Sequence, residues 1–471
     1  MLLNRKTLLS KAAFALTSIL TTTATSSIGS TGASLPASTT NDVNPFSEDP
    51  LLLRVARGEY VTQSQTPPTS TPTPTPTPVW MMRQAGRHMK AYRDLVQKYP
   101  TFRQRSEIPK VALEISLQPY LAYGVDGIIL FSDILTPLPQ MGIEFVIGES
   151  GKIEIELPLL DCKEVFEGGT KLKRCTDYQD CVAGKVLRKI RKYLKANKHH
   201  SATVLGFIGL PYTIATYLVE GKTAAASGFA KMTQLVQEKD ETKIQWLHDM
   251  LALLADNLAD YACFQIDSGA QVIQVFDSWA GHLRPKEYKK FALPYQQRVI
   301  ASIRSRHPET PIIIYMAPAK YSKNGQRLNL LAESGATVVS VDHTVHLKKA
   351  IRTLRHYPNV KAVQGNLNPI FLRDASTEDI QKATRKLIAQ AKAMKMPHIV
   401  NLGHGILPDT PEEKAAAFVE TVHSYPSPRN KKESPPKSDH SSDGRKRELS
   451  ILECLLEIVG QGALLFEAVQ S

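Results

Sequence analysis

The chain has 471 residues and carries 58 Lys and Arg residues against 45 Asp and Glu, which gives a formal charge of +13. Its 42% hydrophobic and 22% charged residues are typical of a globular protein and exclude a collagen, a coiled coil and a fully disordered chain. No apolar run approaches the ~18–20 residues of a membrane-spanning helix, so we predict no transmembrane segment. The five cysteines form no CxxC pair, which predicts a reducing compartment and no metal site.

Both ends of the chain differ in composition from its middle. Residues 1–45 begin with basic residues and a short apolar stretch, contain no acid before position 42, and are rich in Ser and Thr. This pattern is typical of a transit segment, so we expect a plastid (chloroplast) stroma location, with the mitochondrion or cytosol as alternatives. Residues 427–471 read as a basic linker followed by an amphipathic helix, which could dock on the main domain, dimerise or touch a membrane surface. We expect both ends to be disordered extensions of one domain at 46–426.

Two further segments of that domain are unusual. The Thr-Pro repeats at 65–78 predict an extended, inserted surface segment. Residues 163–200 are rich in Lys and Arg, and 184–198 predicts a helix with Val186, Leu187 and Ile190 on its apolar face together with Leu194. Without interleaved aromatic residues or a known binding fold, we interpret the basic face as solvated and predict no nucleic-acid partner.

Eight short apolar runs in the middle of the chain predict β-strands that are buried on both faces. They are residues 79–82, 127–131, 203–207, 271–276, 311–315, 337–341, 361–365 and 398–402. Helical patterns separate them, and eight such units predict an α/β fold of the (β/α)₈ TIM-barrel type. An open doubly wound sheet is the alternative. Polar residues follow most runs, which favours the barrel because its strand ends converge on one mouth.

The residues at these strand ends predict a site for a polyanionic ligand. Arg83 and Arg87 lie four apart after the first run, and two guanidinium groups can bind carboxylates or phosphates. The other candidates follow later runs: Asp133, Tyr217, Ser278 beside Asp277, and His404 in the sequence NLGHG. No nucleotide-binding loop or metal-ligand motif is present, so we predict a site without a cofactor.

At these residues the chain closely resembles the uroporphyrinogen decarboxylase family in its plastid and cyanobacterial form. The motifs that carry the resemblance are MRQAGR (82–87), FSD (131–133), FDSWAG (276–281) and NLGHG (401–405), and it covers roughly residues 49–425. The resemblance implies a barrel that forms a homodimer with facing mouths. It also implies the conversion of uroporphyrinogen III to coproporphyrinogen III, in heme and chlorophyll biosynthesis, by loss of four acetate carboxylates as CO₂ without a metal or prosthetic group.

The same resemblance assigns roles to particular residues. Asp133 and Arg83 are the implied catalytic residues, and Asp133 accepts the pyrrole N–H groups. Arg83, the backbone of Ala85, and Arg87 hold the carboxylates of the substrate. Tyr217, Ser278 and His404 complete the implied pocket.

The chain departs from the family pattern at three places. His343 stands where the family has Trp, the loop 316–325 is reworked, and the segment 221–232 is shortened. These departures leave a non-catalytic tetrapyrrole-binding paralogue as an alternative function. A corrinoid-dependent methyltransferase on the same barrel ranks last, because no His and Cys spacing for its zinc site is present.

Overall fold

The computed structural model describes residues 49–59, 76–148, 153–155, 172–197, 201–222 and 228–425. The expected targeting segment, most of the Thr-Pro segment, and the basic linker with its C-terminal helix lie outside these residues. Among the described helices, none is both long and apolar enough to cross a membrane.

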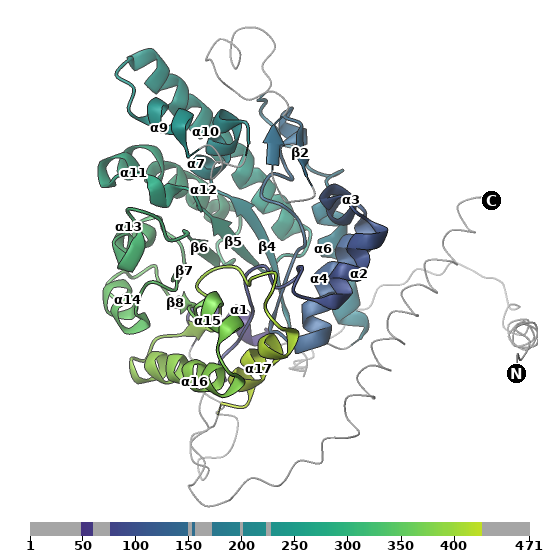
Figure 1. Ribbon diagram of the computed structural model, residues 1–471. Coiled ribbons are helices and arrows are strands. Elements are labelled where there is room, and N and C mark those ends of the chain that lie inside the picture. The colour runs from purple at the N-terminus through teal and green to yellow at the C-terminus, as the bar shows by residue number, and fades with distance from the viewer. Residues whose placement is uncertain are drawn as a thin grey trace, which may run out of the picture. The chain divides into compact units, whose positions relative to one another are not determined.

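Seven parallel strands form one curled sheet at the centre of the molecule (Figure 1). In order across the sheet they are β1 (Gly127–Ile129), β4 (Thr203–Gly209), β5 (Val272–Phe276), β6 (Ile312–Tyr315), β7 (Val338–Ser340), β8 (Ala362–Gln364) and β9 (His398–Ile399). Each one coincides with a predicted run, although β4 continues two residues beyond the predicted end at 207, and their residues are almost all buried, as expected for a parallel sheet covered on both faces. A separate antiparallel hairpin, β2 (Phe145–Ile147) and β3 (Ile153–Ile155), was not predicted.

The prediction of a full strand at 79–82 is wrong. Val79 forms an isolated bridge with Val400, and its carbonyl accepts a hydrogen bond of 2.8 Å from Asp126 N. The segment therefore lies between β9 and β1 and joins the two edges of the sheet, although it does not close the barrel with a regular ladder. The reason is that side-chain oxygens of Gln84 and of the distant Asn401 accept the N–H groups of Met81 and Met82 that a strand would donate to its neighbours.

Polar side chains inside the curled sheet link both neighbouring and distant strands. Trp80 Nε1 donates to Gln364 Oε1 at 2.9 Å, and Gln364 Nε2 donates to Gln274 Oε1 at 3.2 Å and to Ser340 Oγ at 2.9 Å. These residues come from the 79–82 segment, β8, β5 and β7, so the interior is packed and the sheet curls round on itself. The predicted (β/α)₈ class is confirmed by this arrangement, and the open sheet is not formed.

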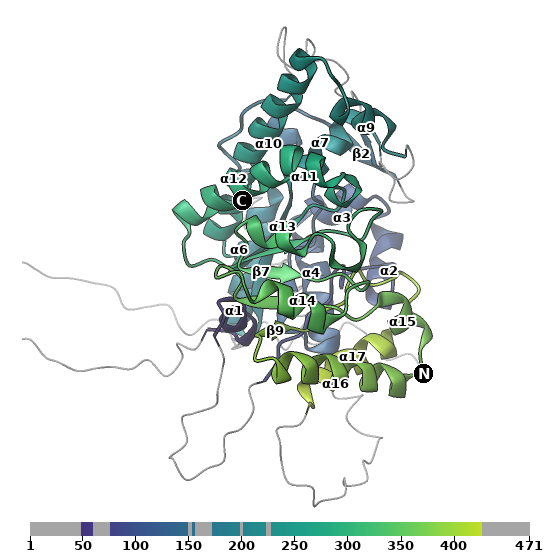
Figure 2. The same ribbon diagram turned by 90° about the vertical axis from the view of Figure 1, so that its left-hand side faces the viewer.

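Helices surround the sheet in both views (Figures 1 and 2). They are α1 (Leu51–Ala56), α2 (Lys90–Lys98), α3 (Phe102–Glu107), α4 (Pro109–Tyr123), α6 (Val182–Ala196), α7 (Pro211–Glu220), α9 (Ala230–Val236), α10 (Glu241–Asp267), α11 (Pro285–Phe291), α12 (Leu293–Arg306), α13 (Leu328–Glu333), α14 (Leu347–Leu354), α15 (Pro369–Asp374), α16 (Thr377–Ala393) and α17 (Glu412–His423). In both views the hairpin strand β2 and helix α9 lie at the top of the molecule, and α16 and α17 lie at the bottom.

Helix α6 confirms the predicted amphipathic helix in the basic segment. Its buried face includes Val186, Leu187, Ile190 and Leu194, while its lysines are exposed. Two of its arginines donate to the chain near β5: Arg188 to Ser268 Oγ at 2.9 Å, and Arg191 to Gln271 Oε1 at 2.8 Å. The positive charge therefore lies on the outer surface of the barrel, away from the strand ends.

Candidate active site

The turn that carries Arg83 is held by a buried glutamine. Gln84 accepts a hydrogen bond from Met81 N at 3.0 Å and donates one to Gly127 O at 2.9 Å, which fixes the turn against β1. Arg83 itself has a φ of 61°, in the left-handed region that costs a non-glycine residue about 1 kcal/mol. With its neighbour anchored, the Arg83 side chain remains exposed at the end of the sheet.

Arg83 lies at the centre of the candidate site. Its positive charge acts to lower the pKa values of four side chains that come from different parts of the barrel, Asp133, Tyr217, Tyr315 and His404, although burial is the larger effect and raises the pKa of the first three. Three of these four were predicted from the sequence. The structure therefore brings Arg83, Asp133, Tyr217 and His404 together at the carboxyl ends of the strands.

Asp133 lies in a tight turn after β1. Its Oδ1 accepts a hydrogen bond from Leu135 N at 2.9 Å, and its own N–H donates to Thr136 Oγ1 at 3.1 Å. Burial raises the pKa of Asp133 above the usual value for an aspartate, although the Leu135 N–H and the Arg83 charge act in the opposite direction. Proximity to arginine thus limits the rise in pKa but does not reverse it, because desolvation is the larger effect.

Tyr217 and His404, which lie near Arg83 and Asp133, are both uncharged at neutral pH. Burial raises the pKa of Tyr217 to about 12, and Asp133 contributes further. Burial lowers the pKa of His404 to about 4, and the positive charge of Arg83 lowers it too. Because its imidazole is neutral at pH 7, His404 can donate or accept a hydrogen bond but cannot supply a positive charge.

Among the described residues, Ser278, Ala85 and Arg87 form no hydrogen bond or ion pair with Arg83. Ser278 is half-buried in the turn after β5. Ala85 is half-buried and packs against the cluster that contains Met89, while Arg87 is exposed and its carbonyl accepts a hydrogen bond from Arg93. The structure thus places these three predicted residues on the same loops as the site, without joining their side chains to it.

Asp277, the neighbour of Ser278, is fully buried and holds the β5 turn. Its Oδ1 accepts hydrogen bonds from Thr213 N at 3.2 Å and Thr213 Oγ1 at 2.6 Å, and its Oδ2 accepts one from Gln296 Nε2 at 2.7 Å. Burial raises its pKa to about 6, against the effect of these hydrogen bonds. Asp277 therefore links β5 to α7 and α12, and its carboxylate is fully occupied.

Sequence reasoning missed Tyr315 as a residue of the site. Its hydroxyl donates to Gly403 O at 3.3 Å, and its ring lies edge-on to that of His404, with 6.4 Å between centroids. It is the last residue of a predicted strand, so its position at the carboxyl end of the sheet was the available signal. His343 lies beside it, with Nδ1 3.4 Å from the same carbonyl.

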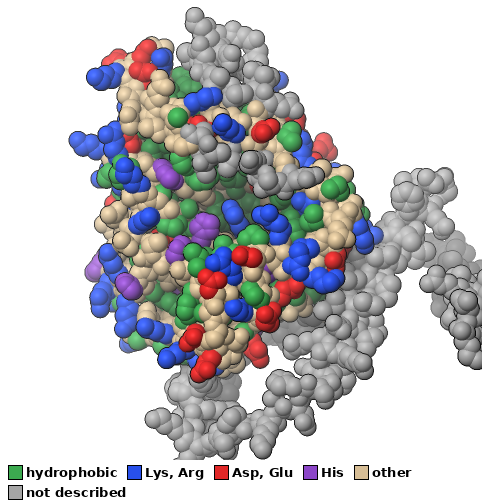
Figure 3. All heavy atoms as spheres, in the orientation of Figure 1, with side chains coloured by type: hydrophobic (Ala, Val, Ile, Leu, Met, Phe, Trp, Pro, Cys, Tyr) green, Lys and Arg blue, Asp and Glu red, His purple; other side chains and the backbone are tan. Residues whose placement is uncertain are grey.

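The face of the molecule that contains these strand ends is hollowed near its centre (Figure 3). Hydrophobic side chains line the depth of the hollow, and Lys, Arg and His side chains gather at its rim. This distribution suits a ligand with an apolar body and peripheral negative charges.

Comparison with known proteins identifies the family. A family model described as uroporphyrinogen decarboxylase matches residues 49–425. The chain belongs to the uroporphyrinogen decarboxylase family. A protein of that name from Trichormus variabilis is 45% identical over 79% of this chain and 96% of its own length, and one from Prochlorococcus marinus is 44% identical over 79% and 95%. The family predicted from the sequence motifs is confirmed.

A solved structure shares the fold of this uroporphyrinogen decarboxylase family member at much lower identity. A methyltransferase from Methanosarcina mazei aligns with a TM-score of 0.59 and 18% identity, covering 80% of this chain and 98% of its own. At this identity the likeness concerns the fold alone. Within the described part of the chain, no group of three His, Cys, Asp or Glu residues is arranged to hold a metal ion.

The two glycines of the family motif NLGHG make room for protein side chains and backbone. A Cβ atom at Gly405 would lie 2.5 Å from Arg83 Cδ, and one at Gly403 would lie 2.2 Å from His343 N. Gly405 thus allows the Arg83 side chain to cross the loop, and Gly403 allows the loop to pack on the turn after β7. In the structure, Arg83 and His343 therefore occupy the space beside these two glycines.

Proposed function

We propose that the chain removes the four acetate carboxylates of uroporphyrinogen III as CO₂ and produces coproporphyrinogen III, a step of porphyrin biosynthesis that leads to heme and chlorophyll. The observation that carries this proposal is the family membership: relatives that bear the name uroporphyrinogen decarboxylase are 43–45% identical over 79–80% of the chain. The cluster of Arg83, Asp133, Tyr217 and His404 supplies the chemistry that the reaction needs.

Decarboxylation of an acetate group on a pyrrole requires an electron sink. Protonation of a ring carbon makes the pyrrole cationic, the C–COO⁻ bond then breaks with its electron pair entering the ring, and CO₂ leaves. A second proton then adds to the methylene carbon and completes the methyl group, and the ring carbon gives up the first proton, which restores the neutral aromatic pyrrole. A fixed carboxylate in a poorly solvated pocket stabilises the cationic intermediate, and we assign this role to Asp133.

The hydrogen bonding of Asp133 fits this role. Its Oδ1 is held by Leu135 N–H, while no described residue donates to its Oδ2. Oδ2 is then available to accept the pyrrole N–H groups of the substrate. Arg83 favours the ionised form of Asp133 and, as the second catalytic residue, can also bind a carboxylate near the reacting ring.

The remaining predicted residues bind the rest of the substrate in this proposal. Arg87 and the backbone of Ala85 hold peripheral carboxylates, and Tyr217, Ser278 and His404 complete the pocket. Because Tyr217 and His404 are uncharged at neutral pH, they offer hydrogen bonds to the substrate, and the charge that attracts its carboxylates comes from the arginines.

An anaerobic turnover assay tests the proposal. The purified protein is given enzymatically prepared uroporphyrinogen III under reducing conditions, and the products are separated after oxidation to porphyrins. We expect a series of intermediates with fewer carboxylates that ends at coproporphyrinogen III. Tight binding of the substrate without release of CO₂ would instead support the non-catalytic paralogue, for which the replacement of Trp by His343 at the site is the structural argument.

We further propose a homodimer with facing mouths, located in the plastid stroma. The cyanobacterial relatives support a plastid-like origin, and the basic, acid-poor N-terminal segment supports import. Light scattering of the purified protein measures its mass and tests the dimer. Import into isolated plastids, followed by N-terminal sequencing of the processed product, tests the location; an unprocessed protein that stays outside would contradict it.

A further inference from the structure

One buried asparagine joins the two loops that carry Arg83 and His404. Asn401 lies just after β9 and is fully buried. Its Oδ1 accepts hydrogen bonds from Met82 N at 3.0 Å and from Leu402 N at 2.7 Å. Met82 directly precedes Arg83, and Leu402 lies in the loop of His404. A single side-chain oxygen therefore binds the backbone of both loops.

Backbone hydrogen bonds reinforce this side-chain contact. Ile406 N donates to Met82 O at 2.9 Å, so both backbone polar groups of Met82 are bound by the segment 401–406. Leu367 N donates to Asn401 O at 3.1 Å, which ties the same segment to the loop after β8. Asn401 thus lies at the junction of three parts of the chain.

The backbone of Arg83 depends on contacts of this kind. Its φ of 61° is in the left-handed region, which a non-glycine residue keeps only where the surrounding structure enforces it. Met81 N donates to Gln84 Oε1 and Gln84 N donates to Met81 O, both at 3.0 Å, which closes the turn on itself. The N–H of Met82 is instead bound by Asn401, 319 residues further along the chain. Gln84 therefore shapes the turn, whereas Asn401 fixes the turn against the rest of the mouth.

The side chain of Arg83 lies across the loop that Asn401 holds. A Cβ atom at Gly405 would lie 2.5 Å from Arg83 Cδ and 3.0 Å from Arg83 Cγ, so the arginine and this loop are in close contact. A shift of the turn relative to the loop would therefore move the guanidinium away from the place that the loop gives it. Such a shift would also change its position relative to Asp133, which lies at the end of another strand.

We propose that Asn401 is a positioning residue for the reaction: its side-chain oxygen holds the turn of Arg83 against the loop of His404 and so fixes the Arg83 guanidinium at the mouth of the barrel. This inference rests on the proposed function. Asn401 is buried and acts through Arg83, so its loss should reduce turnover more than substrate binding. The reason is that other groups, among them Arg87, hold the peripheral carboxylates of the substrate in that function.

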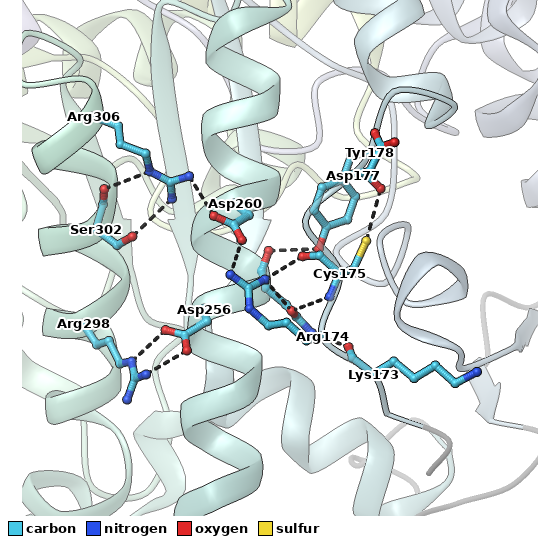
Figure 4. A network of polar contacts seen from close by, with 11 residues as sticks. Lys173, Arg174, Cys175, Asp177, Tyr178, Asp256, Asp260, Arg298, Ser302 and Arg306 are labelled. Carbon is cyan, nitrogen blue, oxygen red and sulfur yellow. Dashed lines mark hydrogen bonds and ion pairs between the residues drawn. The ribbon is translucent and has the colours of Figure 1, made fainter. Parts of the chain in front are cut away.

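Asn257 provides a matched control in another part of the barrel. It is also fully buried, and its Oδ1 likewise accepts two hydrogen bonds, from Arg174 Nη1 at 2.9 Å and from Cys175 N at 3.0 Å. These bonds belong to a polar network that joins the segment before α6 to α10, and in which Arg174 also pairs with Asp260 (Figure 4). Asn257 therefore matches Asn401 in residue type, burial and hydrogen bonding, but it joins outer elements of the barrel.

The experiment compares Asn401→Ala with Asn257→Ala in steady-state decarboxylation, with Tm measured for each variant. We expect kcat to fall about tenfold in Asn401→Ala, with KM within about threefold of the wild-type value, because a small displacement of a catalytic group is costly to rate. Asn257→Ala should keep kcat within about twofold of the wild type. It should lose at least as much Tm, since its side chain makes a third hydrogen bond, from Nδ2 to Lys173 O at 2.8 Å.

Two further variants give readouts that a merely structural role would not change. Within the described part of the chain, Asn401 Nδ2 has no hydrogen-bond partner, so Asn401→Asp removes no contact of that nitrogen. Because it keeps the oxygen that accepts both N–H groups, this variant should return kcat to within about threefold of the wild type. The double variant Arg83→Ala/Asn401→Ala should lose little more kcat than Arg83→Ala alone, since both changes act on one group.

Three results in the single variants would overturn the inference: a wild-type kcat in folded Asn401→Ala, an equal loss of kcat in Asn257→Ala, or an Asn401→Asp variant as slow as Asn401→Ala. Additive losses in the double variant would overturn it too, because Asn401 would then act independently of Arg83. If Asn401→Ala does not fold, Asn401→Ser takes its place, because its shorter side chain cannot reach both N–H groups. A folded wild type without turnover would overturn the proposed function and the inference with it, whereas the other results concern Asn401 alone.

Discussion

Asp133 and Asp277 are both aspartates at the carboxyl ends of strands, and burial raises the pKa of each. Their surroundings differ in the number of hydrogen bonds that they accept. Asp277 is surrounded by donors from Thr213 and Gln296, whereas Asp133 has one backbone donor and the nearby Arg83. At the scale of single residues, the carboxylate with an oxygen left free is the one suited to bind a substrate, and the saturated one stabilises the fold.

The raised pKa of Asp133 predicts an acid limb in the pH profile. The ionised form is the one that stabilises a cationic intermediate, so activity should fall as the pH drops through that pKa, above the ~3.9 of an ordinary aspartate. Asp133→Asn and Asp133→Ala should lose about 100-fold or more in kcat at every pH. Both should remain folded, because Asp133 accepts only one hydrogen bond through its side chain. Steady-state rates between pH 4 and 8 check this, and wild-type rates in Asp133→Ala would remove the residue from the mechanism.

Asp277 predicts an unusual pH dependence of stability. With a folded pKa of about 6 against about 3.9 unfolded, the folded state binds the proton more tightly. Its contribution to the free energy of unfolding is therefore greatest below pH 4 and declines by about 3 kcal/mol as the pH rises to 6 and above. Urea unfolding of the wild type and Asp277→Asn at pH 4.5 and 7.5 isolates this group. A stability difference that does not vary with pH would contradict the prediction.

At the scale of elements, the end of β6 and the loops after β7 and β9 meet at the carbonyl oxygen of Gly403. Gly403 O accepts a hydrogen bond from the Tyr315 hydroxyl and lies close to His343 Nδ1, while the loop itself packs on the backbone of His343. These contacts place His404 beside Arg83. Gly405 makes room for the Arg83 side chain and Gly403 for the His343 backbone, so substitutions at the two glycines should have different effects.

Gly405→Ala should impair activity more than stability. The new Cβ would meet the flexible end of the Arg83 side chain at 2.5 Å, so the guanidinium moves and the backbone stays. We expect kcat/KM to fall about tenfold or more with a small change in Tm, as for displacement of a group that orients the substrate. Gly403→Ala is the contrast, because its Cβ would meet the backbone of His343 at 2.2 Å and should lower Tm by several degrees. A larger loss of Tm in Gly405→Ala than in Gly403→Ala would contradict the assignment of Arg83 as the side chain displaced by the new Cβ.

The seam between β9 and β1 depends on helix α17. Asp126 Oδ2 accepts hydrogen bonds from Val79 N at 2.7 Å and from His423 Nε2 at 3.0 Å. This pairing raises the pKa of His423, so its stabilising effect is complete below pH 6.5 and is lost as the pH rises through the raised value. His423→Gln should lower the free energy of unfolding, and with it Tm, at pH 6 and should have no effect at pH 9. The loss at pH 6 should be less than about 1 kcal/mol because the pair is partly exposed. An equal effect at both pH values would exclude the ion pair as its cause.

At the scale of the whole molecule, the family match and the described barrel coincide. The match spans residues 49–425, and every described strand, helix and candidate site residue lies in that range. The Lys and Arg residues that give the chain its positive charge lie partly on the outer face of α6 and partly beyond the barrel. The charge of the whole chain is therefore a weaker guide to its ligand than the few arginines at the mouth.

A shortened chain of residues 49–425 should keep the turnover and the Tm of the full chain. All the contacts described at the mouth and along the seam are made within this range. Steady-state rates and thermal unfolding of the two chains side by side check the prediction. A large loss of activity in the shortened, folded chain would show that an end segment contributes to the site or to the dimer.

The sequence alone was enough to determine the fold class, the places of seven strands and most residues of the candidate cluster. This was possible because burial on both faces leaves a continuous apolar run, and because strand ends in a barrel must meet at one mouth. It failed at 79–82, where the side chains of Gln84 and Asn401 accept hydrogen bonds that a strand would give to its neighbours. An apolar run in the sequence does not show whether side chains distant in the chain will accept the backbone hydrogen bonds of that run.

Only the tertiary structure decided how the predicted residues differ in their tasks. Asp133 and Asp277 both follow predicted strands, and Tyr315 lies within an apolar pattern. Whether a carboxylate is saturated depends on atoms that are distant in the chain, such as those of Gln296 for Asp277. Motifs record which residue types chemistry needs, whereas desolvation and hydrogen-bond partners are properties of packing, which exist once the barrel has formed.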